Sequence, residues 1–254
     1  MLASLYSICL QYIVENNQEL TTLENVPFKP FVQDIINGIF QSEKPFEKST
    51  LSLIGKAHGQ HLFKQIHPTF TCICLSQLCP IGSSVVALKF LSSNFPEIIT
   101  QLDLSHTDIG DRHIPLLNGF KYLQILDLCN MELLTDIGIS HLSAMNTTAT
   151  NRLPFLKELY LADNDSITDK VLKYIGKMET LNYIDLTNTC VTEEVAIIYL
   201  KTLGFVQTNK RKAVDWPPLC LKLHRDIRNM LIDNGEFMKR CKTKGDPEEK
   251  EQFI

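Results

Sequence analysis

The sequence predicts an α/β fold built as a solenoid, with short parallel strands in one sheet, helices on the convex side, and a helical cap at each end. Two observations predict this fold. Similar segments recur along the middle of the chain, and each segment alternates apolar and polar residues before a stretch of helical periodicity. The 254 residues are enough for one such array with flanking segments.

Four segments carry the repeat: IITQLDLSHTDIGD, LQILDLCNMELLTD, LKELYLADNDSITD and LNYIDLTNTCVTE. Each fits the leucine-rich pattern L-x-x-L-x-L-x-x-N/C-x-L, in which the L-x-L core is a short strand. The intervals between Leu104, Leu128, Leu161 and Leu186 are 24, 33 and 25 residues, and a polar stretch at 146–152 lengthens the second. A weaker copy, FTCICLSQL, precedes them. We expect strands at Ile73–Leu75, Leu102–Leu104, Leu126–Leu128, Leu159–Leu161 and Ile184–Leu186.

Composition and periodicity divide the chain into four segments. Residues 1–66 carry three helical patterns, and residues 67–205 carry the repeats. Residues 206–234 contain VDWPPLCLKLHRDIRNMLID, whose leucines stand at helical spacing, and we expect them to cap the C-terminal end of the array. Residues 235–254 are highly charged and are expected to be disordered.

Charge and motifs exclude several classes of function. The net charge of −4 does not indicate a nucleic-acid partner, no apolar run is long enough to span a bilayer, and the N-terminus lacks the basic region of a signal peptide. We therefore expect a cytoplasmic or nuclear protein whose 8 cysteines are thiols. The sequence has no phosphate-binding loop, nucleophile elbow or zinc-protease motif, so we predict no enzymatic activity and no cofactor.

Two groups of side chains could in principle ligate zinc. His58 and His61 are three residues apart, and Cys72 and Cys74 share one face of an expected strand, with His67 upstream. Neither group has the spacing that structural zinc sites use. We interpret the histidines as part of a half-exposed helix and the cysteines as ordinary strand residues, and we predict no metal site.

The residue between the two inward apolar residues of each strand is expected on the concave face. Adjacent strands lie ~4.8 Å apart, so the carboxylates at this position would form a ladder. One interpretation is a binding face for a basic peptide. The other, which we favour because water and salt screen exposed charges, is a row of solvated aspartates that hydrogen-bond to neighbouring turns. The residues concerned are Asp103, Asp127, Tyr160 and Asp185.

The N-terminal stretch SLYSICLQYI places Leu5, Cys9 and Ile13 in one row of a helix. Its pattern Ser-Leu-x-x-x-Cys-x-x-x-Ile resembles the elongin-C-binding box of the Zyg-eleven-type substrate receptors. The resemblance implies that Leu5 enters a hydrophobic pocket of elongin C, with Cys9 as a small neighbouring group. The downstream stretch VPFKPFVQDII resembles the second half of such boxes, in which a helix helps to contact a cullin. Its matching positions are Val26, Pro27, Phe28, Val32 and Ile36.

From Ser4 to Asn209 the chain also resembles the leucine-rich repeat-containing protein 42 family. The resemblance is carried by SLYSICLQYIVENNQELTTL, QLDLSHTDIGD, SITDKVLKYIG, YIDLTNTCVT and LKTLGFVQTNK. That family has no established enzymatic activity, so the resemblance implies a module that binds other proteins. We expect protein partners, no nucleic acid, no membrane, and a monomer in isolation.

These resemblances lead to two hypotheses. In the first, the chain is an adaptor: the N-terminal helices bind elongin B/C and a cullin, and the repeats present a substrate for ubiquitin transfer. In the second, it is a plain protein-binding scaffold whose N-terminal helices only cap the repeats. The row of Leu5, Cys9 and Ile13 separates them, because it is buried against the first repeat in a cap and exposed in an adaptor.

Overall fold

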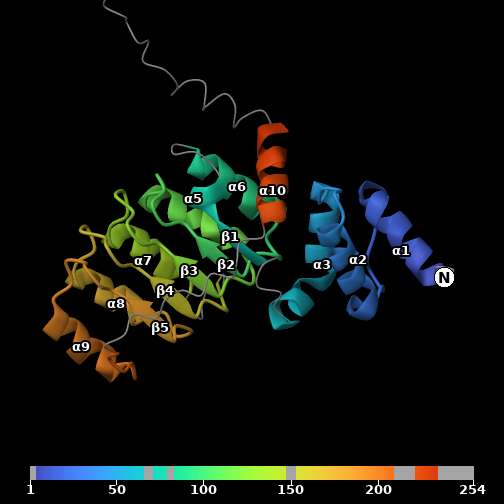
Figure 1. Cartoon of the computed structure of the whole chain (residues 1–254). Coiled ribbons are helices and arrows are strands. Elements are labelled where there is room, and N and C mark those ends of the chain that lie inside the picture. The colour runs from blue at the N-terminus through green and yellow to red at the C-terminus, as the bar shows by residue number, and fades with distance from the viewer. Residues whose placement is uncertain (1–3, 66–70, 79–82, 147–152, 209–220, 234–254) are drawn as a thin grey trace, which may run out of the picture.

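The computed structural model describes residues 4–65, 71–78, 83–146, 153–208 and 221–233. These residues form an α/β structure in which helices flank a five-stranded parallel sheet (Figure 1). The strands follow one another in the sheet in the order of the sequence. They are β1 (Cys72–Cys74), β2 (Gln101–Asp103), β3 (Ile125–Asp127), β4 (Glu158–Tyr160) and β5 (Tyr183–Asp185).

The expected α/β class and the single parallel sheet are confirmed, although each strand begins and ends one residue earlier than predicted. The middle residues of neighbouring strands pair directly, so that Leu102 stands opposite Leu126 and Leu126 opposite Leu159. All three leucines are fully buried. Ile184, in the last strand, is only partly buried. The core is therefore continuous under the sheet and thins toward β5.

Helical segments connect the strands. Their apolar sides join the strand leucines in one buried cluster, as stacked repeats require. In this region the polar stretch at 146–152 lies mostly outside the described residues. The connecting segments are α5 (Leu75–Leu78), α6 (Ser84–Asn94), η3 (Asp111–Gly119), α7 (Asp136–Met145), η4 (Asp169–Val171) and α8 (Leu172–Ile175), and α9 (Glu193–Thr202) follows β5.

A carboxylate near the start of one repeat's helical segment binds the next repeat. The side chain of Asp136 accepts the backbone N–H of Thr168 at 2.9 Å and its hydroxyl at 2.7 Å. The Thr168 hydroxyl oxygen in turn caps η4 by accepting the N–H of Lys170. The same pair of bonds occurs at three junctions: Asp111 with Thr135, Asp136 with Thr168, and Asp169 with Thr192. These bonds set the spacing between repeats on their helical side.

Three helices precede the sheet, as the periodicity predicts: α1 (Leu5–Glu15), α2 (Gln33–Gln41) and α3 (Lys48–Gln65). Two short segments link α1 to α2, a 3-10 turn η1 (Asn17–Glu19) and a π-helical turn η2 (Phe28–Val32). None of the described helices is long and apolar enough to cross a membrane.

The helices α1 and α3 occupy different places. The helix α3 lies against the repeats: a Cβ atom at Gly55 would stand 3.0 Å from Ile98, and one at Gly59 would stand 2.8 Å from Tyr122. Glycine at these positions permits the close approach. The helix α1 packs against α2, at the end of the molecule away from the sheet (Figure 1).

The last helix, α10 (Leu221–Asp233), corrects the predicted domain organisation. Residues 206–234 were expected to cap the C-terminal end of the array, but α10 lies between the N-terminal helices and β1 (Figure 1). Its residues Leu223, Ile227 and Leu231 are buried there. The helical spacing of the leucines predicts a helix, whereas the surface that the helix covers depends on contacts between residues far apart in sequence. The expected disordered tail, 235–254, lies outside the described residues.

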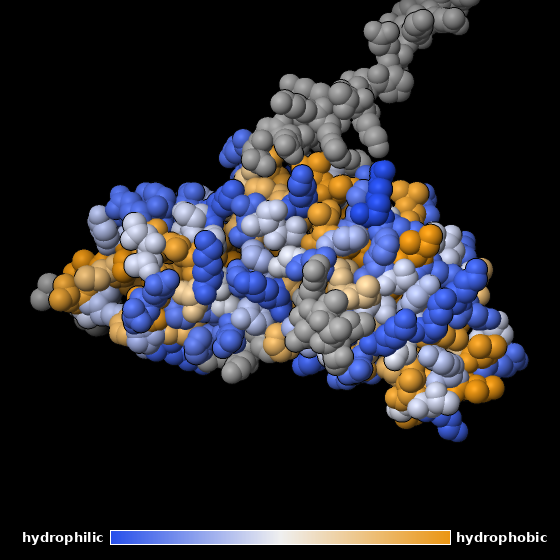
Figure 2. All heavy atoms as spheres, turned by 180° about the vertical axis from the view of Figure 1, so that it is seen from behind, coloured by the Kyte–Doolittle hydropathy of each residue, from blue (hydrophilic) through white to orange (hydrophobic). Residues whose placement is uncertain are grey.

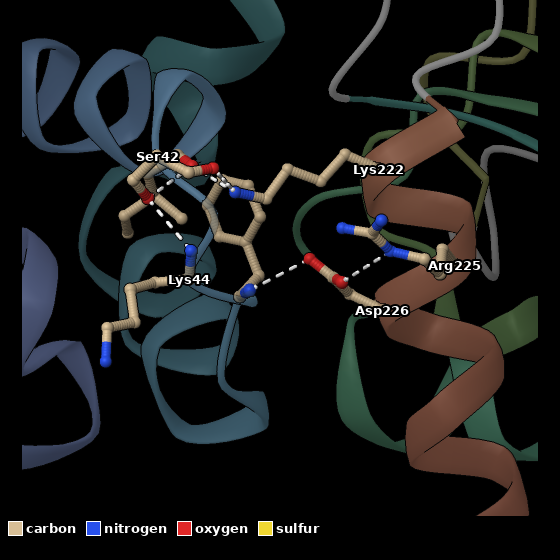
Figure 3. Close-up of polar contacts among 7 residues, drawn as sticks. Ser42, Lys44, Lys222, Arg225 and Asp226 are labelled. Atoms are coloured by element: carbon tan, nitrogen blue, oxygen red, sulfur yellow. Dashed lines mark hydrogen bonds and ion pairs between the residues drawn. The ribbon is translucent and has the colours of Figure 1, made fainter.

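Polar contacts hold α10 to the loop after α2 (Figure 3). The Lys222 ammonium donates to the carbonyl oxygens of Ile39 and of Ser42, the latter at 2.6 Å. The Asp226 carboxylate accepts the backbone N–H of Phe46 at 3.0 Å. The last described helix is thus joined to the segment between α2 and α3, which a simple linear array would not require.

Candidate functional site

An exposed apolar surface covers α1, and we call it the α1 surface. Leu5 is 77% exposed, Ile8 54% and Tyr12 61%, and Cys9 between them is also exposed. These four residues follow the spacing i, i+3, i+4 and i+7, so they form one stripe of the helix. Figure 2 shows the corresponding hydrophobic side chains at the left end of the molecule. A contiguous apolar stripe in water is a feature of sites that bind a partner.

Contacts on the other side of α1 fix its position. The Ser4 hydroxyl oxygen caps the helix by accepting the N–H of Ser7 at 3.2 Å. Val14 is buried beside α2, where a Cβ atom at Gly38 would stand 2.6 Å from Val14 Cγ2. Ile13, the third residue of the predicted row, is partly buried against the core. The row of Leu5, Cys9 and Ile13 therefore runs from an exposed N-terminal end to a partly buried residue that contacts the core.

Tyr6 adds a second link between α1 and α2. Its hydroxyl donates to Asp34 Oδ2 at 2.6 Å, and its ring lies 5.9 Å from that of Phe31. The hydrogen bond to the Asp34 carboxylate raises the pKa of Tyr6 above its usual value. Since Phe31 is itself 41% exposed, the α1 surface continues onto η2.

The residues expected to contact a cullin are placed differently. Pro27 is exposed, but Phe28, Val32 and Ile36 are at most 5% exposed. The Phe28 ring stacks on that of His61, with centroids 5.5 Å apart. In the described structure these three apolar side chains hold the N-terminal helices together and are not available to a partner. Phe28 faces α3, where its ring lies against those of His58 and His61.

The four residues expected on the concave face are also buried, with exposures of 7% for Asp103, 7% for Asp127, 1% for Tyr160 and 4% for Asp185. Each aspartate accepts the backbone N–H of the residue two positions later, at 2.8 to 3.0 Å. Such bonds form Asx turns, which end the strands. The solvation expected of these carboxylates is therefore wrong, whereas the expected hydrogen bonds to turns are present. Burial leaves little of these groups exposed to a basic peptide.

An aromatic pair lies on the same face of the sheet. The Tyr160 hydroxyl donates to Glu158 Oε2 at 2.8 Å, and its ring is 5.1 Å from that of Tyr183. Burial, with the neighbouring Glu158 carboxylate, raises the pKa of Tyr160 far above its usual value. Cys129 and Ala162 complete this small apolar cluster. This face of the sheet thus carries apolar and aromatic groups beside the buried aspartates.

The potential zinc ligands that the structure describes make other contacts. The Cys74 thiol donates to Asp103 Oδ2 at 3.0 Å, and burial raises the pKa of Cys72 to about 12, so that this thiol stays protonated at neutral pH. His58 packs on Phe28, and His67 lies outside the described residues. Among the described residues, no three histidine, cysteine or carboxylate side chains are grouped closely enough to hold a metal ion.

Sequence reasoning missed a second apolar surface, on α9 at the C-terminal end of the sheet. Val195 is 44% exposed, Ile198 70%, and Leu203 and Val206, just beyond the helix, 41% and 84%. The signal was present in the apolar residues of EEVAIIYLKT, but no surface was predicted from them.

A parallel sheet with its strands in sequence order and leucines in the strands are features of the leucine-rich-repeat class of proteins. Within that class, the chain is 26% identical over 203 residues to "Leucine-rich repeat-containing protein 42" of Mus musculus, covering 76% of this chain and 45% of the relative. The proteins of the same name from Xenopus laevis and Xenopus tropicalis are 24% identical over 199 residues and 22% identical over 250 residues. The alignment with the Xenopus laevis protein covers 75% of this chain and 44% of the relative. The alignment with the Xenopus tropicalis protein covers 92% of this chain and 55% of the relative.

These similarities support the leucine-rich repeat-containing protein 42 family. The chain spans about half the length of the curated relatives it matches. No family model matches the sequence. Among solved structures, "Leiomodin-1 Actin-Binding Site 2 (ABS2)" is similar with a TM-score of 0.42 and 13% identity, covering 73% of this chain and 96% of that one. A likeness at this level carries no argument about function.

Proposed function

We propose that this chain is a non-enzymatic leucine-rich-repeat solenoid that binds other proteins, and that it serves as a substrate-recognition adaptor of an elongin B/C–cullin ubiquitin ligase. The observation that carries the proposal is the exposure of Leu5 and Cys9 on α1. In this proposal the α1 surface binds elongin C, and the repeats are left free to bind a substrate.

The arrangement of the α1 surface suits a helix that enters a groove. Such helices are recognised through apolar anchors at spacings of three and four residues, as Leu5, Ile8, Cys9 and Tyr12 are. Leu5, more exposed than Ile8 and Tyr12, would be the principal anchor, because interface energy concentrates in a few side chains that become buried. The cysteine at the centre of the stripe has a small side chain, so the walls of a groove can approach the helix closely there.

The contacts of α1 argue against the alternative in which this helix only caps the repeats. A cap must cover the apolar end of the array, and α3 together with α10 occupies that place. Deleting the exposed part of α1 would uncover no repeat. A plain scaffold without elongin B/C remains the competing function, and the two differ in what the α1 surface binds.

The cullin part of the proposal rests on the resemblance of VPFKPFVQDII. Of its predicted contact residues, Pro27 is accessible, whereas Phe28, Val32 and Ile36 are core residues. A cullin would therefore be contacted through the exposed edge of η2, around Pro27, and through the bound elongin B/C.

The test is capture of purified elongin B/C by the full chain and three variants. Leu5→Ala should weaken binding by about thirtyfold, the loss typical of a principal anchor. Cys9→Phe should abolish binding, because a larger ring overfills the groove. Ile137→Ala, on α7, is the matched control: Ile137 is 59% exposed but lies outside the α1 surface, so binding should not change.

Melting curves of the same proteins complete the experiment. Leu5 and Cys9 are exposed, so all the variants should melt with the wild type. Failure of the wild type to capture elongin B/C would refute the adaptor proposal. If both α1 variants melted well below the wild type, α1 would be a part of the fold that stabilises it and not a binding surface.

A further inference from the structure

The end of the array at α9 is built like a junction between two repeats. The helix α7, which packs between the preceding segment η3 and the following helix α8, has five buried residues, whereas α9 has none among its described residues. Val195 and Ile198 instead point to solvent, with exposures of 44% and 70%. Figure 2 shows hydrophobic side chains at the lower right, the end of the molecule where α9 lies. A surface of this kind exposes apolar area that a neighbour would cover.

The polar ladder between repeats also reaches its last member here. Thr192 binds the carboxylate of Asp169 in the preceding repeat, and Glu193 follows Thr192 as Asp169 follows Thr168. In the described structure the Glu193 carboxylate accepts a long bond, 3.4 Å, from the Gln207 side chain. In the earlier repeats the carboxylate at this position binds the threonine of the next repeat. At Glu193 the same position is exposed to solvent.

The exposed stripe of α9 has a charge pattern that is complementary to itself. Its solvent-facing residues follow helical spacing and run from an acid through apolar groups to a base: Glu194, Val195, Ile198, Lys201 and Thr202. Two such stripes placed antiparallel, with Ile198 at the centre, bring Glu194 of one copy beside the partner's Lys201, and the reverse. Antiparallel packing also sets the two helix dipoles in favourable opposition.

We infer that α9 is a dimerisation surface, on which a second copy of this chain docks as an antiparallel helix pair about a twofold axis. A twofold contact is self-complementary, so one stripe supplies both halves of the interface. Leu203 and Val206, beyond the end of α9, would extend the apolar contact toward the residues that precede α9 in the partner copy. The contact lies at the opposite end of the molecule from the α1 surface and leaves that surface free (Figure 1).

The structure also bounds the strength of the dimer. The helix α9 has 10 residues, and a pair of such helices buries less than the ~1,200 Å² of a standard interface. We therefore expect a micromolar dimer, and the monomer expected from the sequence only at lower concentration. A head-to-tail contact between α9 and the α1 surface would instead give open chains that lengthen with concentration.

Sedimentation of the full chain across the micromolar range tests the inference. The wild type should pass from monomer to dimer and stop there. Ile198→Glu places two carboxylates at the centre of the contact and should raise the dissociation constant by at least about thirtyfold. Ile137→Glu is the matched control, because Ile137 is a similarly exposed isoleucine away from α9, and it should leave dimerisation unchanged.

A charge exchange identifies the antiparallel pairing and separates it from misfolding. Glu194→Lys and Lys201→Glu should each weaken the dimer by several-fold, since each places like charges opposite one another, and the double variant should recover it. A wild type that stays monomeric, assemblies that grow beyond a dimer, or a double variant weaker than both single ones would overturn the inference. Each outcome is independent of elongin binding.

Discussion

Asp226 joins the C-terminal helix to the N-terminal part of the chain, and its removal tests that arrangement. The side chain is 3% exposed, and its Oδ2 atom accepts the backbone N–H of Phe46, 180 positions away in the sequence, at 3.0 Å. Arg225 Nε lies 3.7 Å from Oδ1, with its own side chain 63% exposed (Figure 3). The bond to Phe46 is thus the buried, direct one.

The expected cost of Asp226→Ala follows from that bond. A hydrogen bond to a charged group contributes about 1.5–3 kcal/mol, and the substitution also leaves the Phe46 N–H buried without this acceptor. The ion pair with Arg225 adds little, because the arginine is mostly solvated and exposed pairs are worth less than about 1 kcal/mol. We expect a loss of about 2 kcal/mol, or about 4–8 °C in Tm for a chain of this size.

The assay combines thermal unfolding with hydrogen exchange at the Phe46 amide. Asp226→Ala should lower Tm and speed exchange at Phe46. Asp233→Ala is the matched control, since Asp233 is an exposed aspartate at the end of the same helix and should change neither. If Asp226→Ala left both Tm and Phe46 exchange unchanged, α10 would not be held at this place, and the C-terminal cap expected from the sequence would have to be reconsidered.

Two further predictions concern the repeats and the response to pH. Asp136→Ala removes both bonds to Thr168 and should lower the free energy of unfolding, measured with urea, by about 1–3 kcal/mol. Asp165→Ala removes an exposed aspartate near the same turn and should leave the free energy of unfolding unchanged. Equal stability of the two variants would contradict a role for the Asp136 carboxylate in joining the repeats. Burial lowers the pKa of His58 and of His224 below the usual value of about 6.5, so the unfolded chain takes up protons first on acidification. The stability that these neutral histidines provide is present above that usual value and is lost as pH falls through the lower folded pKa values. Urea midpoints measured from neutral to acid pH should therefore decline, and His58→Gln should flatten the decline; an unchanged slope in this variant would show that His58 does not contribute.

Local patterns in the sequence were sufficient to predict the repeats. A strand of three residues with leucine at its centre is specified by alternation alone, and Leu102, Leu126 and Leu159 all point into the core as predicted. The strand limits were shifted by one residue, because pairing between neighbours, rather than the second leucine, decides where each strand ends. The capping pair of Thr168 and Asp136 joins different repeats, so it could not be recognised within a single segment.

The candidate sites depended on burial, which a local pattern does not specify. Asp103 and Asp127 were assigned to the correct face of the sheet, yet their carboxylates turn back onto the chain and are shielded by neighbouring strands. Phe28 and Val32 were expected to meet a partner, yet they are covered within the N-terminal helices. The sequence pattern is the same whether such a residue is buried within the fold or exposed to a partner.

The α/β class, the order of the strands and the helical character of the flanking segments follow from side-chain periodicity over a few residues, so they could be predicted from the amino acids alone. The return of α10 to the N-terminal helices, the exposure of Leu5 and Ile198 and the burial of Ile36 depend on long-range packing. An amphipathic helix must cover its apolar stripe, but the free energy gained depends on the area removed from water and hardly at all on which surface removes it. The choice of surface is therefore made by shape and long-range contacts, and at α1 and α9 that choice leaves the stripe for a partner.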